Sequence, residues 1–160
     1  MRMDHVSLAV RDVDRSIEFY SKALGMKTLR ISVLHPTPES EVKNAYMYSD
    51  TFLLELVTAE GSANQRTSPK TWQEGMRGSI GITHLGVKVK NLDKAIQNVK
   101  AAGGVMLGEP FEVKKETTRL IYVAGKVDSK IAYAKKPGRK PWRIALFTDP
   151  DGVMVELIER

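Results

Sequence analysis

Apolar and polar residues alternate along two short stretches of the chain, 5–10 and 84–89. In the first, Val6, Leu8 and Val10 fall on one side of an extended backbone, and polar or small residues fall on the other. A period of two residues is typical of a strand with one buried face. Both stretches are therefore predicted to be half-buried β-strands.

A helical period follows each of these strands. Asp12 is placed to cap a helix that ends at Gly25, and Asn91 is placed to cap a second helix that ends near Gly103. The apolar positions that recur at helical spacing are Val13, Ile17, Tyr20 and Leu24, and then Leu92, Ile96 and Val99. Each strand is thus predicted to lead into an amphipathic helix.

The chain repeats its own pattern. Residues 5–17 reappear as 84–96, and residues 50–57 reappear as 151–158. The second copy contains an insertion, because the spacing between the two copies is larger for the second match than for the first. An internal repeat of this kind predicts two related structural units.

Three further strands are predicted in each unit. They lie near 26–34, 44–49 and 52–58 in the first unit, and near 104–107, 143–148 and 153–158 in the second. The fold class is therefore α+β, with two tandem βαβββ modules in one domain: 1–59, a linker over 60–80, and 81–160. A basic insertion near 112–140 is expected to add a hairpin at about 118–134.

The charge is concentrated in that insertion. The net charge is +6, but residues 112–143 hold ten Lys or Arg against three Asp or Glu, which leaves the rest of the chain near neutrality. The basic segment either attracts an anionic substrate or is a solvated loop, and the second interpretation is favoured. A nucleic-acid partner is not expected from so local a charge.

Other features of the composition bear on the cellular compartment and on membrane association. The chain has no Cys, which excludes disulfides and thiolate chemistry and suits a reducing, cytoplasmic compartment. No apolar run is long enough to span a membrane, so no membrane association is expected.

Strand parity places a set of polar side chains away from the predicted helices. His5, Ser7 and Ala9 share the face opposite Val6 and Leu8, and the copy places His84, Gly86 and Lys88 in the same way. Glu55 and Glu156 each lie between two apolar residues of the last strand in their module. A carboxylate in that setting is costly unless something pairs with it.

His5, Glu55, His84 and Glu156 together form a candidate site for one divalent metal ion: Ni, Co, Mn, Fe or Zn. Taken singly, each is better explained as a strand-end histidine or a surface glutamate. The recurrence of both residue types in the same register favours the metal site. His35, which has no counterpart in the repeat, is interpreted as a surface residue.

With these residues, the chain resembles the vicinal oxygen chelate superfamily, which includes glyoxalase I, methylmalonyl-CoA epimerase, extradiol dioxygenases and bleomycin resistance proteins. The most specific segments are 5–26, 83–104 and 147–156. The resemblance implies a cupped eight-stranded mixed sheet with helices outside, a metal ion inside, and a small-molecule substrate that chelates it through adjacent oxygens. It also implies a homodimer.

The ligand set is most similar to that of bacterial glyoxalase I. The epimerases usually have Gln at the position of Glu55, and the dioxygenases use two His and one Glu. Ala9 and Ala59 stand where glyoxalase I has an Arg and an Asn that hold glutathione, which counts against that substrate.

The expected activity is metal-dependent proton transfer next to a carbonyl, of the lyase or isomerase type. Glu55 and Glu156 are the candidate catalytic bases, and Ser7 and Lys88 are candidate substrate-binding residues. Epimerase-like and dioxygenase-like activities remain alternatives. So does a protein that binds a small molecule without chemistry, although such relatives usually lose metal ligands.

Overall fold

The computed structural model describes residues 4–35, 41–50, 52–58, 68–77, 82–113 and 141–159. The helices are α1 (Val13–Leu24), α2 (Trp72–Arg77) and α3 (Leu92–Ala101). The strands are β1 (Val6–Val10), β2 (Lys27–Leu34), β3 (Val42–Ser49), β4 (Phe52–Thr58), β5 (Leu85–Val89), β6 (Val105–Met106), β7 (Phe111–Val113), β8 (Trp142–Thr148) and β9 (Met154–Glu159).

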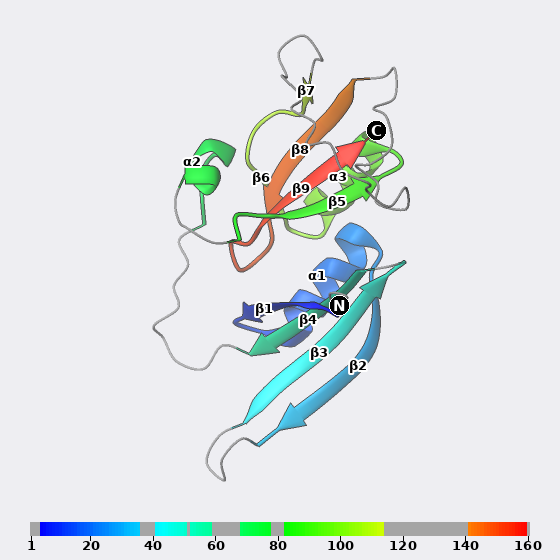
Figure 1. The fold of residues 1–160 in the computed structure, drawn as a ribbon, viewed down its shortest axis with the longest axis vertical. Coiled ribbons are helices and arrows are strands. Elements are labelled where there is room, and N and C mark those ends of the chain that lie inside the picture. The colour runs from blue at the N-terminus through cyan, green and yellow to red at the C-terminus, as the bar shows by residue number, and fades with distance from the viewer. Residues whose placement is uncertain are drawn as a thin grey trace, which may run out of the picture.

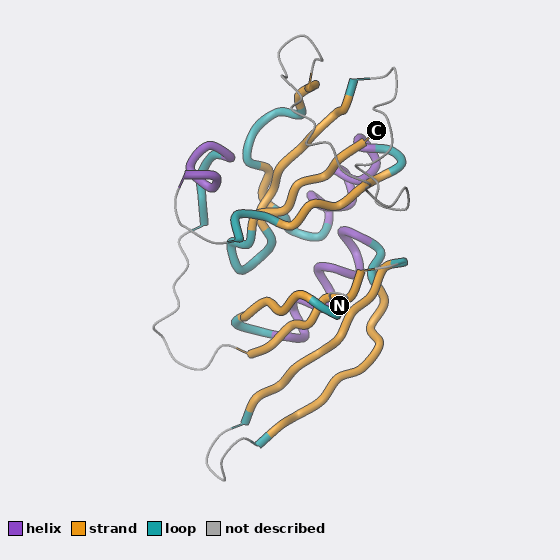
Figure 2. The backbone as a smooth tube through the Cα atoms, in the orientation of Figure 1, coloured by secondary structure: helices purple, strands orange, loops and turns teal. Residues whose placement is uncertain are grey.

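The strands form two sheets with related topology. Sheet 1 has the order β1-β4-β3-β2, and sheet 2 has the order β5-β9-β8-β6, with β7 also paired to β8. In each sheet the first strand pairs in parallel with the last, and the other pairs are antiparallel. The first half of the chain lies below the second in Figure 1, and Figure 2 shows the helices and strands of both halves in the same orientation.

The expected α+β class with mixed sheets is confirmed. The arrangement differs in one respect from a single eight-stranded sheet, because the described strands belong to two sheets of four and five. In the described ranges, strand pairing stays within each sheet. A common cup would therefore have to form by packing the two sheets together, either within one chain or between two chains.

The helix ends follow the capping signals in the sequence. The Asp12 side chain accepts a hydrogen bond from the Arg15 backbone N–H, and Asn91 accepts one from Lys94. Gly25 ends α1 in the left-handed conformation, with a φ of 68° that favours glycine. These caps fix where α1 begins and ends and where α3 begins.

The two halves pack against each other through their helices. Helix α1 contacts α3, and the main apolar cluster contains residues from both sheets. The turn between β8 and β9 also reaches α1, where the buried Tyr20 hydroxyl donates to Asp149 at 2.8 Å. The sheet faces that contact the helices are buried or half-buried in this way, although β2 of sheet 1 is exposed along almost its whole length. The opposite faces carry the candidate site residues.

Two short elements were not predicted from the sequence. Helix α2 lies within the expected linker, and its Trp72 stacks on Phe111 of β7 with ring centroids 5.8 Å apart. Trp72 also packs against a second apolar cluster on sheet 2, formed by Leu107, Ile144, Leu146 and Met154. Because Leu146 lies opposite Glu156, part of the face of sheet 2 that carries Glu156 is thereby covered.

The expected hairpin at 118–134 and the basic side chains of 114–140 lie outside the described residues. Among the helices that are described, none is both long and apolar enough to cross a membrane. His35 is exposed, as expected of a surface residue.

Candidate functional site

Sheet 1 brings His5 and Glu55 together. In the parallel β1–β4 pair, Ser7 lies opposite Glu55, and His5 precedes Ser7 by two residues on the same face. The imidazole Nε2 of His5 lies 3.5 Å from Oε2 of Glu55. This face, opposite α1, is called the His–Glu face of sheet 1.

Sheet 2 repeats the arrangement. Gly86 lies opposite Glu156 in the parallel β5–β9 pair, and His84 again precedes the facing residue by two. Nε2 of His84 lies 3.4 Å from Oε2 of Glu156. The corresponding face of sheet 2, opposite α3, is its His–Glu face. The repeat in the sequence is thus also a repeat in the geometry of these side chains.

The four residues are present as two pairs on two sheets. Within the described part of the chain, no three His, Asp or Glu side chains form a group that could hold a metal ion. A single chain in this arrangement therefore offers two candidate half-sites. Each half-site supplies one imidazole nitrogen and one carboxylate.

The geometry of each pair fits a shared divalent ion. Two ligands at about 2.1 Å from a tetrahedral or octahedral ion lie roughly 3.0–3.4 Å apart, close to the 3.5 and 3.4 Å observed. Nδ1 of His5 contacts Asp4 at 2.9 Å, and Nδ1 of His84 contacts Thr83 at 2.9 Å. When Nδ1 carries the proton, the Nε2 lone pair faces a carboxylate oxygen, an arrangement that a cation between them would stabilise.

Glu55 is held by several hydrogen bonds. Asn44 donates from Nδ2 to Oε1 at 2.9 Å, and the hydroxyls of Ser7 and Tyr46 also bond the carboxylate. Burial raises the pKa of Glu55, but these hydrogen bonds and the nearby His5 outweigh burial, so the pKa lies below its usual value. The Glu55 carboxylate is therefore held in place by hydrogen bonds, and its ionised form is favoured.

Glu156 has a less polar setting. It lies between Gly86 on β5 and Leu146 on β8. A Cβ atom added at Gly86 would lie 3.7 Å from Oε2 of Glu156, so glycine leaves space beside this carboxylate. Among the described residues, its carboxylate lies within 3.4 Å of His84 Nε2. Glu156 is consequently less constrained than Glu55.

Two residues near Glu55 were missed as site residues in the sequence. Asn44 is a buried polar residue in the middle of β3, and Arg30 of β2 lies over the Tyr46 ring, 4.8 Å from its centroid. Tyr46 also contacts His5 edge to face, with ring centroids 5.5 Å apart. Strand parity places Asn44 and Tyr46 on one face, but only the β2–β3 register places Arg30 beside them.

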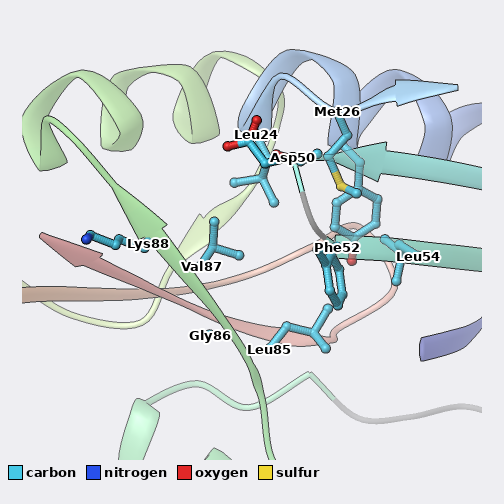
Figure 3. Close-up of a pocket in the computed structure, with 11 residues that line it drawn as sticks. Leu24, Met26, Asp50, Phe52, Leu54, Leu85, Gly86, Val87 and Lys88 are labelled. Atoms are coloured by element: carbon cyan, nitrogen blue, oxygen red, sulfur yellow. The ribbon is translucent and has the colours of Figure 1, made fainter. Parts of the chain in front are cut away.

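The two candidate substrate-binding residues lie on different sheets. Ser7 hydrogen-bonds Glu55 in sheet 1, whereas Lys88 lies on the exposed edge strand β5 of sheet 2. Lys88 and Gly86 line a pocket of about 220 Å³ between β5, the start of β4 and the end of α1. In Figure 3, Leu85 lies beside Phe52 in this pocket, and the Lys88 side chain extends away from Phe52 and Leu54.

Two repeated units of mixed sheet and helix, each with a His–Glu pair at matching register, define a duplicated scaffold that presents the same pair of side chains twice. The chain belongs to the Glyoxalase/Bleomycin resistance protein/Dioxygenase superfamily, whose family model matches residues 2–157. The resemblance drawn from the sequence is therefore confirmed.

Individual relatives agree with this assignment. The chain is 30% identical to the lactoylglutathione lyase of Escherichia coli O157:H7, over 99% of this chain and 93% of that protein. It is 31% identical to a probable chloroplastic lactoylglutathione lyase of Arabidopsis thaliana, of which it covers 36%. The crystal structure of glyoxalase I from Zea mays matches with a TM-score of 0.64 and 26% identity, over 99% of this chain and 44% of that one. The chain thus spans less than half the length of the two plant proteins.

Proposed function

We propose that the protein is a divalent-metal-dependent lyase or isomerase of the glyoxalase type, which transfers a proton next to a carbonyl group. The observation that carries this proposal is the repeated His–Glu pair, with Nε2–Oε2 separations of 3.5 and 3.4 Å in the two sheets. An ion such as Ni, Co, Mn, Fe or Zn would be held by His5, Glu55, His84 and Glu156. It would supply Lewis-acid polarisation of the substrate's oxygens.

The complete ligand set is proposed to form between two copies of the chain. One chain presents its half-sites on two different sheets, whose helices pack against each other. A twofold dimer that brings sheet 1 of one copy against sheet 2 of its partner would complete both sites at once, because such an interface is self-complementary. A homodimer is therefore part of the proposal.

The two glutamates are proposed to have different roles. Glu55 accepts hydrogen bonds from Asn44, Ser7 and Tyr46, so it is suited to remain a ligand. Beside Glu156, Gly86 leaves room for about a methyl group, since a Cβ atom there would lie 3.7 Å from Oε2, and Glu156 is suited to act as the base. It would take the proton from the carbon beside the carbonyl and return it to the neighbouring carbon, so that hydrogen and electrons balance within the substrate.

The substrate is proposed to be a small molecule with two adjacent oxygens. The relatives' name, lactoylglutathione lyase, points to the hemithioacetal of a 2-oxoaldehyde and a thiol as the first compound to assay. The thiol is left open, because Ala9 stands where the resemblance places a glutathione-binding Arg.

The test is an assay of the full chain loaded with each of the five metals in turn. The probe is the hemithioacetal formed from methylglyoxal and glutathione or 2-mercaptoethanol, followed by thioester formation. We expect Glu156→Gln to lower kcat by about 100-fold or more while the metal is retained. Glu55→Gln should instead weaken metal binding. Turnover equal to wild type in both variants would contradict the assignment.

A further inference from the structure

The segment between the two repeats gives sheet 2 a covering element of its own. The βαβββ pattern occurs twice in the chain, whereas α2 belongs to the linker, and its Trp72 packs on sheet 2 (Figure 1). The two His–Glu faces carry the same paired side chains. Their surroundings differ, because the linker helix is not part of the repeat.

Helix α2 is fixed both at its start and along the side that contacts the sheet. The Glu74 backbone N–H donates to Oγ1 of Thr71 at 3.3 Å, and Oε2 of Glu74 accepts from the Lys70 backbone N–H at 2.8 Å. Both bonds satisfy backbone donors at the start of the helix. A Cβ atom added at Gly75 would lie 2.6 Å from Sδ of Met154, so glycine lets the helix lie this close to β9.

The apolar cluster that Trp72 contacts borders Glu156 on two sides. Leu146 of β8 lies directly opposite Glu156, and Met154 precedes Glu156 by two residues on the same face of β9. Leu146 and Met154 are only 7% and 2% exposed. Trp72 packs against the cluster that both belong to, and its ring stacks on Phe111. The indole therefore belongs to the apolar surface that adjoins the Glu156 carboxylate.

Glu55 has different neighbours at the equivalent positions. Tyr46 lies opposite Glu55 as Leu146 lies opposite Glu156, and the Tyr46 hydroxyl bonds the Glu55 carboxylate. The side chain of Glu156 is 20% exposed, and its carboxylate faces His84. An apolar wall beside a carboxyl group limits the water that can reach it, and slows the exchange of a bound proton with solvent.

We propose that Trp72 shields the Glu156 carboxyl from water on the β8 side, so that the proton taken from the substrate returns to the substrate before it exchanges with solvent. The inference rests on the proposed function, because it takes Glu156 as the base. A C–H bond of the substrate breaks as the Glu156 O–H bond forms, and this O–H bond breaks as the new C–H bond forms. The electron pair stays within the substrate. Trp72 acts through Glu156 and is a positioning residue.

The first measurement needs no turnover. The full chain, freed of metal with a chelator, is treated with a water-soluble carbodiimide and glycine ethyl ester, and peptide mass spectrometry follows the labelling of Glu156. Glu18, an exposed glutamate of α1, is the reference within each sample. The variants are Trp72→Ala and Trp72→Phe. The control is Leu29→Ala, which shortens an exposed apolar side chain on the outer strand of sheet 1.

Trp72→Ala should raise the labelling rate of Glu156 relative to Glu18 by about threefold or more, because it opens the apolar side of the carboxyl to water and reagent. Trp72→Phe keeps an aromatic ring and should give a smaller rise, and Leu29→Ala should give none. Thermal unfolding verifies the fold of each variant, and Trp72→Phe decides the matter where Trp72→Ala does not fold. A labelling rate of Glu156 equal to that of wild type would overturn the inference.

The second measurement follows the transferred hydrogen. The hemithioacetal of methylglyoxal is turned over in D₂O, and NMR gives the deuterium content of the product at the carbon that receives the proton. Trp72→Ala should raise the deuterium fraction by about twofold or more, whatever its kcat, because the proton on Glu156 then exchanges faster with solvent. A purely structural role would change kcat and leave this fraction unchanged. An unchanged fraction, or a fully deuterated product from wild type, would contradict the role of Trp72.

These outcomes are separable from the proposed chemistry. Faster labelling of Glu156 in Trp72→Ala, in a protein that shows no proton transfer, would retain the shielding and reject the activity. Conversely, Glu156-dependent turnover, with the same labelling rate and deuterium fraction in wild type and Trp72→Ala, would retain the activity and reject the role of Trp72.

Discussion

At the scale of single residues, the most informative environment is that of Glu55. Burial raises its pKa, and hydrogen bonds from Asn44, Ser7 and Tyr46 together with the charge of His5 lower it further than burial raises it. A carboxyl whose pKa is lowered on folding stabilises the fold above its usual pKa. That contribution is lost as the pH falls through the lowered value.

Asn44→Leu should raise the pKa of Glu55, because it removes the donor that bonds Oε1 at 2.9 Å. The measurement is a ¹³C NMR titration of the side-chain carboxyl groups in the metal-free protein. The carboxyl of Glu156, on the other sheet, serves as the reference within the same spectra. An unchanged Glu55 midpoint would show that Asn44 does not hold the carboxylate.

Residue-scale prediction from the sequence succeeded where strand parity alone was sufficient. Parity placed His5 with Ser7 on one face, and Glu55 on one face of its own strand. It could not place Arg30, because the β2–β3 pair has an irregularity between Thr28 and Arg30 that shifts the register. A change of register by one residue moves every later side chain to the other face.

At the scale of elements, α1 is joined to the β8–β9 turn by buried polar contacts. Tyr20 is fully buried and donates to Oδ2 of Asp149, while Oδ1 accepts from the backbone N–H groups of Asp151 and Val153. Burial raises the pKa of Asp149, and these hydrogen bonds oppose that rise. Because its pKa is raised on folding, Asp149 adds to stability at low pH, and this contribution is lost as the pH rises through the raised value.

Tyr20→Phe should destabilise the fold by about 1–3 kcal/mol at neutral pH, because it leaves a buried carboxylate oxygen without its donor. Urea unfolding measures this, with Tyr48→Phe, an exposed tyrosine, as the control. The deficit should shrink in acid as Asp149 becomes protonated. A Tyr20→Phe midpoint equal to that of wild type at neutral pH would refute the role of this contact.

The elements that the sequence predicted are those with strong local signals. Asp12, Asn91 and Gly25 marked the ends of α1 and the start of α3, and alternation marked β1 and β5. Helix α2 and strand β7 have only six and three residues, too few to establish a period. Their stability comes from the Trp72–Phe111 contact and the apolar cluster on sheet 2, which are tertiary interactions.

At the scale of the whole molecule, the duplication makes two His–Glu pairs at matching register but does not dictate how they meet. Each half presents the same two residue types at the same register, so a pairing within one chain and a pairing between two chains use the same sequence pattern. The packing of α1 against α3 is what favours the second, because it places the halves helix to helix. The sequence contains no local signal for this choice.

The most direct measurement is complementation between two defective chains. One chain carries His5→Ala and Glu55→Gln, and the other carries His84→Ala and Glu156→Gln, so that each alone lacks one half-site. The chains are refolded together, and native mass spectrometry counts the Ni or Zn bound to the mixed dimer. Two copies that share their sites should give one tightly bound metal ion per mixed dimer and recover up to half of the wild-type activity. A mixed dimer that binds none, or a wild-type chain that binds its metal as a monomer, would contradict the account.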